Sequence, residues 1–202
     1  MKPINDINKI ISVISDPSHI RTAKTRQVIS TNTHQEPMTL VIHEGLLAAY
    51  RNSDHLLLRY FQAPLIVGLN VLTDMNDGIF YKAYSDVRYE LQPRETVLEK
   101  IDHAKLWRET AMLFMFGVKR FAEAHKNSAG LSTYELIRLN LQGLMEEEEE
   151  LRLAINVSDY IQEKTHLSRS RVMKILSDLR EGNYIEINRG ILMKVNKLPE
   201  NY

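Results

Sequence analysis

Three cations near the C-terminus have the clearest capacity to bind a ligand. Arg169, Arg171 and Lys174 lie within residues 168–180, where apolar residues recur at i, i+3, i+4 and i+7: Val172, Ile175, Leu176 and Leu179. This spacing predicts a helix that buries one stripe and begins after an N-cap at Ser168. A short helix with cations in its first turns is typical of helices that enter the major groove of DNA.

The residues on either side predict a winged helix-turn-helix. Residues 157–161 indicate a second short amphipathic helix, and residues 163–167 are a polar break between the two helices. Residues 184–195 predict strand, tight turn and strand, with Arg189 at the tip for phosphate contact. A small α+β domain with solvated cations is the alternative, but the order of elements favours DNA binding. We therefore predict as DNA-binding residues Ser168, Arg169, Ser170, Arg171, Lys174 and Arg189.

Charge and composition narrow the function classes. The 202-residue chain has no net charge, but residues 151–202 carry nine Lys/Arg against six Asp/Glu, so cations gather around the predicted helix. The absence of cysteine excludes disulfides, thiolate zinc sites, Cys-ligated iron–sulfur clusters and a Cys nucleophile. Because no apolar run approaches about 18 residues and the N-terminus lacks an apolar signal core, we expect a soluble cytoplasmic protein without a membrane partner.

The N-terminal half predicts an antiparallel β-barrel or sandwich, preceded by an amphipathic helix within residues 4–16. Short apolar runs alternate with turn residues, as in all-β folds. We assign residues 1–102 to this domain. The expected strands are residues 26–30, 38–42, 46–50, 56–61, 65–69, 79–84 and 87–91.

A long helical pattern at residues 104–126 follows a short helix at 93–102. Residues 111–118 are apolar on every side, which predicts that both faces are buried, one on the barrel and one on a second copy. The alternative is a central helix of a monomeric core, and Met112 and Met115 are expected to fill a core. We assign residues 103–127 to a dimerisation helix. Its predicted interface is Leu106, Thr110, Leu113, Phe114, Gly117 and Phe121.

Residues 127–130 indicate a hinge, and residues 131–202 are assigned to the DNA-binding domain. One helix is expected from Ser132 to about Arg152. The five acids at residues 146–150 are interpreted as a solvated helix face rather than an interaction surface.

This order of domains resembles the cyclic AMP receptor protein/FNR superfamily of dimeric bacterial transcription regulators. Residues 168–179 are similar to the superfamily's recognition helix. Residues 106–109, 179–186 and 198–202 are similar to enterobacterial regulators named for inhibition of hydrogen peroxide resistance. The resemblance implies an α+β fold with a cyclic-nucleotide-binding-like barrel, a homodimer, double-stranded DNA and RNA polymerase as partners, and a role in oxidative-stress or virulence gene expression.

Three departures limit what the resemblance implies. Gly68 is followed by Leu69 rather than the ribose-binding Glu of cyclic-nucleotide binders, and residues 77–84 replace their phosphate-binding Arg cassette. We therefore expect no cyclic AMP binding and no cofactor, and no ligand is identified. Ser170 stands where the superfamily usually places a base-reading Glu, so its usual half-site is not expected.

Two other functions are weighed against DNA regulation. A cupin-type metal enzyme would need clustered histidines, but His43-Glu44 stands without a His-x-His motif, so we expect no enzyme. A regulator acting only through protein partners would not need the cations of residues 169–189.

Overall fold

The computed structural model describes residues 2–31, 36–69, 78–125 and 131–200, without the side chains of residues 121 and 123–125. The chain divides into two compact units, residues 1–126 and residues 127–202. Each unit is described separately.

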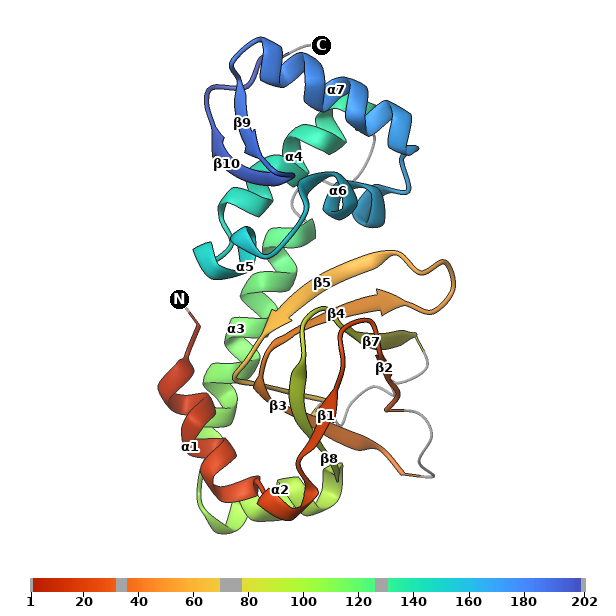
Figure 1. Ribbon diagram of the computed structural model, residues 1–202. Helices are drawn as coiled ribbons and strands as arrows, with labels where there is room; N and C mark the ends of the chain where they lie inside the picture. The colour runs from red at the N-terminus through yellow and green to blue at the C-terminus, as the bar shows by residue number, and fades with distance from the viewer. Residues whose placement is uncertain (1, 32–35, 70–77, 126–130, 201–202) are drawn as a thin grey trace. The chain divides into compact units, whose positions relative to one another are not determined.

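The N-terminal unit confirms the predicted antiparallel β architecture. Its described strands form two four-stranded sheets of order β1-β8-β3-β6 and β2-β7-β4-β5 (Figure 1). The strands are β1 (Arg21–Ala23), β2 (Val28–Ile29), β3 (Met38–Glu44), β4 (Leu46–Arg51), β5 (Leu57–Gln62), β6 (Leu65–Val67), β7 (Ile79–Ala83) and β8 (Val87–Pro93).

Two strand predictions were wrong in detail. Strand β1 was missed because three residues are too few to show a period. The strand predicted at residues 26–30 shortens to β2 because Arg26 adopts a φ of 73° and turns the chain. A left-handed residue cannot continue a β-ladder.

Helix α1 (Ile4–Ile14) supplies one wall of the N-terminal core, followed by the 3₁₀ turn η1 (Pro17–His19). Ile7, Ile10 and Ile14 are fully buried and join a core that includes Leu40 and Ile42 of β3. Each such side chain contributes about 1.5–3 kcal/mol of burial.

A fully buried carboxylate, Glu90 on β8, links α1 to the sheet. The Glu90 carboxylate accepts hydrogen bonds from the Ser15 hydroxyl, the Asp16 N–H (2.9 Å), the Gln92 amide (2.7 Å) and His43 Nε2 (2.6 Å). Burial by itself would raise the pKa of Glu90, but these four donors outweigh it and lower that pKa.

The same network reaches the next helix, α2 (Arg94–His103). Lys100 Nζ donates to the carbonyl of Ile14 at 2.8 Å and to Gln92 Oε1 at 3.2 Å. The C-terminus of α1 is therefore held by side chains from β8 and α2.

Helix α3 (Trp107–His125) begins three residues later than predicted. Lys105 has a φ of 57°, so the chain turns between α2 and α3. Trp107 Nε1 donates to Asp102 Oδ1 at 2.7 Å across this turn. In the part of the chain that the structure describes, no helix is long and apolar enough to span a membrane.

The C-terminal unit contains four helices and a β-hairpin among its described residues (Figure 1). They are α4 (Thr133–Met145), α5 (Glu149–Leu153), α6 (Val157–Thr165), α7 (Arg169–Glu181), β9 (Ile185–Asn188) and β10 (Ile191–Val195).

The single helix expected from Ser132 to Arg152 was wrong, because α4 ends at Met145 and α5 begins at Glu149. The acidic run covers this break and the start of α5. Like charges three or four residues apart disfavour continuing a helix through this run, whereas acids are favourable in the first turn of a new helix.

Candidate nucleic-acid interface

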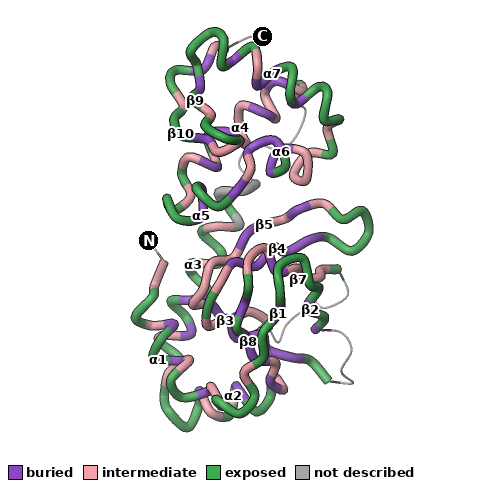
Figure 2. The backbone as a smooth tube through the Cα atoms, viewed as in Figure 1, coloured by how far each residue is buried: buried purple, intermediate pink, exposed green. Residues whose placement is uncertain are grey.

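Helix α7 forms as its spacing predicts. Ser168 adopts an extended conformation, and its Oγ accepts a hydrogen bond from the Arg171 N–H at 3.4 Å. The stripe of Val172, Ile175, Leu176 and Leu179 is buried, as the alternation of buried and exposed segments along α7 shows in Figure 2. This burial leaves the opposite face of α7 to the solvent.

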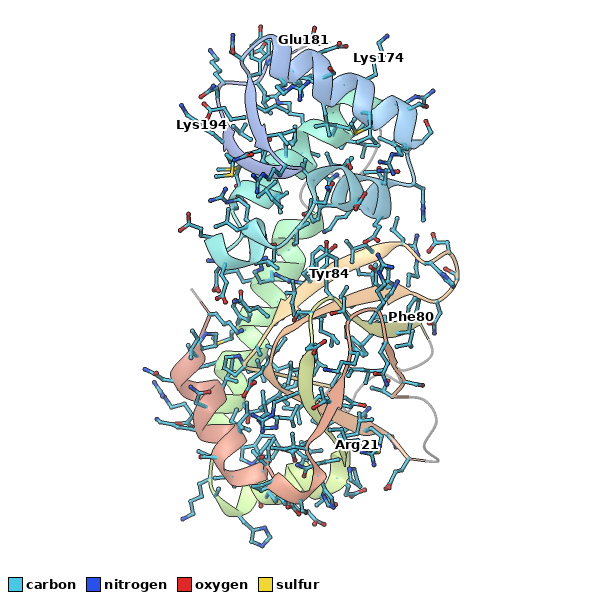
Figure 3. The ribbon with its side chains drawn as sticks, viewed as in Figure 1. Arg21, Phe80, Tyr84, Lys174, Glu181 and Lys194 are labelled. Atoms are coloured by element: carbon cyan, nitrogen blue, oxygen red, sulfur yellow. The ribbon has the colours of Figure 1, made fainter. Side chains whose placement is uncertain are left out.

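At 100° per residue, the line directly opposite the stripe passes through Ser170, Lys174, Ser177 and Glu181. Lys174 points away from the body of its unit in Figure 3. Arg169 and Arg171 are exposed on the two flanks of this line. The geometry can therefore present a hydroxyl and a cation to base edges, with a cation on each side for phosphates.

The residues predicted to bind DNA did not include Ser177 and Glu181. Ser177 Oγ donates to Glu181 Oε1 at 3.1 Å, so the two side chains form a pair on the outer line of α7. The sequence could have predicted both residues, because they continue the i, i+4, i+7, i+11 spacing that starts at Ser170 and extends the exposed face to the last turn of α7.

Arg189 lies in the turn between β9 and β10. Arg189 and Gly190 have φ values of 49° and 84°, as required by a two-residue hairpin turn of type I′. Arg189 is exposed at this tip, which we call the wing tip. The structure thus places Ser168, Arg169, Ser170, Arg171 and Lys174 together on α7 and its cap, and Arg189 apart from them on the hairpin.

Gly190 fits tightly against the start of α6. Its carbonyl accepts a hydrogen bond from the Val157 N–H at 2.8 Å, and a Cβ at Gly190 would lie 2.3 Å from Asn156 Nδ2. Asn156 caps α6, with its Oδ1 accepting from the Ser158 and Asp159 N–H groups. The wing tip is therefore packed against the N-terminus of the helix-turn-helix.

Gly190→Ala is expected to destabilise the C-terminal unit by about 1–3 kcal/mol, because an L-residue is strained at positive φ and its methyl group would displace Asn156. Gly143→Ala is the matched control. Gly143 lies inside α4, with nothing within 4 Å of an added Cβ. That change is expected to stabilise the unit by about 0.5–1 kcal/mol. Chemical denaturation measures the change in the free energy of unfolding for each variant. A change of the same sign in both variants would contradict the packing described for Gly190.

The predicted interface residues, Leu106 just before α3 and the other five on it, fall on two faces. Leu106 and Leu113 pack with the hydrophobic core, and Thr110 is buried with its hydroxyl donating to the Leu106 carbonyl at 2.9 Å. Phe114 and Gly117 are exposed. The side chain of Phe121 lies outside the described residues.

The expectation that Met112 and Met115 fill a core was wrong. Both are exposed, Met115 at 61%, and Val118 is exposed at 68%. With Trp107 and Phe114 they leave a large apolar surface on α3, which we call the α3 apolar face. Large apolar surface on a folded protein usually marks an interaction site.

The cupin-type alternative depended on His43, which lies on β3 beside Glu90. Among the described residues, no group of three or more His, Asp or Glu side chains could hold a metal ion. In the replaced phosphate cassette, Asp77 lies outside the described residues. Residues 79–83 form β7, whose Tyr81 packs against the core.

Comparison with known proteins gives a consistent assignment. A family model for winged helix-turn-helix DNA binding matches residues 133–200. The inhibitor of hydrogen peroxide resistance of Escherichia coli K12 is 33% identical over 207 residues, covering 100% of this chain and 98% of the relative.

Solved structures of lower identity share the fold. The c-di-GMP-responsive global regulator CLP of Xanthomonas campestris superimposes with a TM-score of 0.71 at 15% identity, covering 96% of this chain and 99% of that one. A CRP/FNR-family transcriptional regulator of Thermus thermophilus gives a TM-score of 0.54 at 19% identity, covering 87% and 93%. The chain therefore belongs to the family of inhibitors of hydrogen peroxide resistance, has the CRP/FNR regulator fold and ends in a winged helix-turn-helix DNA-binding domain.

Proposed function

We propose that this chain is a homodimeric transcription regulator that reads operator DNA with α7 and contacts flanking phosphates with the wing tip. The observation that carries the proposal is the outer line of α7. Ser170 and Lys174 lie opposite a fully buried stripe, with Arg169 and Arg171 exposed on the flanks. Side chains that meet base edges specify sequence, whereas flanking cations set register and affinity.

The homodimer rests on the α3 apolar face. Phe114, Met115 and Val118 would remain in water on a lone copy, and a two-fold axis along α3 would bring two such faces together. Because Thr110 and Leu113 are buried and Leu106 packs against the core, the proposed contact moves to the exposed side of α3. A dimer would present two α7 helices to half-sites about 34–36 Å apart.

The cellular role follows from the family. We infer action in oxidative-stress or virulence-related gene expression, in the cytoplasm where the chromosome and RNA polymerase are found. We assign no catalysis, no cofactor and no cyclic AMP binding to the barrel, because the ribose-binding Glu and phosphate-binding Arg cassette are replaced by Leu69 and residues 77–84.

Arg169→Ala tests DNA reading directly. We expect operator affinity to fall on the order of tenfold or more, because a base or phosphate contact made by Arg contributes about 1–3 kcal/mol. The assay is capture of genomic DNA fragments by the purified protein, followed by titration of the enriched site. Arg21→Ala, which removes an exposed cation from β1, is the charge-matched control and should bind normally.

A steep fall of affinity with salt would separate this function from a regulator that acts only through protein partners, because phosphate contact releases counterions. A flat salt response, or equal affinity of Arg169→Ala and the unaltered protein, would contradict DNA reading by α7.

A further inference from the structure

The acidic segment before α6 contains a buried cation that DNA contact does not explain. Arg152 lies on α5 with its side chain only 11% exposed. Its Nη1 donates to the carbonyl of Leu192 at 2.7 Å and to the carbonyl of Met193 at 3.3 Å. The guanidinium therefore binds the backbone of β10, forty residues away in the sequence, where α5 and β10 lie side by side (Figure 1).

Those two carbonyls lie at an irregularity in the β9–β10 hairpin, which is the wing of the winged helix-turn-helix. The β9–β10 register shifts between Leu192 and Lys194, which places Met193 in a β-bulge. Bulges bend a strand and increase its twist, so their geometry determines where the end of a hairpin points.

The described hairpin has the order β10-β9, so β10 has no strand neighbour on its other edge. Backbone carbonyls that leave water need donors from elsewhere. Arg152 Nη1 supplies both of these hydrogen bonds, and the planar guanidinium fixes the direction in which its N–H groups point.

The second attachment of the wing comes from the same segment. Val157 N–H donates to the carbonyl of Gly190, and Asn156 packs against Gly190. Residues 152–157 therefore hold the hairpin at its bulge and at its tip and then continue into α6. Arg189 directly precedes the attachment at Gly190.

We propose that Arg152 is a positioning residue for DNA binding, which fixes the wing so that Arg189 keeps its alignment with α7. This inference rests on the proposed phosphate contact of Arg189. Glu149 is 3.5 Å from Arg152 Nη2 but 77% exposed, so it assists the orientation only weakly. Desolvating a guanidinium is costly, and an apolar side chain would fill the same space at lower cost if stability were the only requirement.

The test compares Arg152→Met, Arg152→Lys, Arg189→Ala and the double variant Arg152→Met/Arg189→Ala. Operator affinity is measured over a range of salt concentrations, with thermal unfolding of each variant. Methionine keeps length and burial but has no donor. Lysine keeps the charge and one donor group, so it should restore part of the affinity.

Arg189→Ala is expected to weaken binding on the order of tenfold and to reduce the salt slope by about 0.9 for each phosphate that is no longer neutralised. Arg152→Met should reproduce most of both effects while leaving the operator sequence preference, which α7 sets, unchanged. The double variant should bind no more weakly than Arg189→Ala, because the two residues act through one contact.

The outcomes separate the two claims. Unchanged binding by Arg189→Ala would overturn the proposed wing contact. Weakened binding by Arg189→Ala, with normal affinity and salt slope for Arg152→Met, would overturn only the positioning role. If Arg152→Met does not fold, Arg152→Lys carries the test in combination with Arg189→Ala, and additive reductions of affinity would overturn the role.

Discussion

Met115→Glu is expected to convert the dimer into monomers and to lower operator affinity about 10²-fold or more. Met115 belongs to the α3 apolar face and is 61% exposed, so the folded monomer tolerates a carboxylate there. In the dimer, two carboxylates would face an apolar surface near the two-fold axis, where desolvation and like charge both oppose association. Loss of the second half-site removes a gain of about 10²–10⁴ in affinity.

Light scattering and operator titration measure the two parts of this prediction. Val28→Glu is the control, because Val28 is an exposed apolar residue on β2, away from α3, and the same charge is introduced. The control should remain dimeric. A dimer that survives Met115→Glu combined with Val118→Glu would place the interface on another surface.

Glu90→Gln is expected to destabilise the N-terminal unit by about 3 kcal/mol at neutral pH. The carboxylate oxygens accept from Ser15, Asp16, Gln92 and His43. An amide turns one acceptor into a donor, so at least one buried donor loses its partner.

The effect depends on pH with a defined sign. Because the folded state lowers the pKa of Glu90, its carboxylate stabilises the fold fully above the ordinary value of 4.5, and this contribution is lost as pH falls through the lower folded pKa. The stability difference between the unaltered protein and Glu90→Gln should therefore be largest near pH 7 and shrink below about pH 4.5.

Denaturant unfolding of both proteins at pH 7 and at pH 4 checks this. Glu44→Gln, on the same strand as His43, is the control. Glu44 pairs with Arg88 at the surface and should change stability little at either pH. A constant difference between the unaltered protein and Glu90→Gln at both pH values would contradict the role of ionised Glu90.

The spacing of neighbouring residues was sufficient to predict an element wherever that element has one buried face. The stripe of α7, its Ser168 cap and a tight turn at Arg189 follow from neighbouring residues. The strands β3 to β8 follow from short apolar runs between turn residues. The resemblance to a family of regulators was also visible, because it depends on the order of elements and on short matching segments.

Other features were decided only by the tertiary structure. Residues 111–118 are apolar on every side, so no alternation of apolar and polar residues predicts which face of α3 packs on the barrel. Contacts with the core assign Leu113 to that face and leave Met115 exposed. The acidic run did not predict where α4 ends, since a solvated helix face and a helix break have the same composition.

The remaining features join residues far apart in the chain. His43 meets Glu90 across two neighbouring strands, and Arg152 meets the bulge of β10. Nothing in the local pattern marks these residues, because a polar residue in an amphipathic segment is ordinarily solvated. The sequence by itself predicted helix α7, the winged helix-turn-helix around it and DNA as its class of partner. Only the tertiary structure decided which charged side chains are buried and what they hold in place. The reason is that burial depends on contacts between residues tens of positions apart in the sequence.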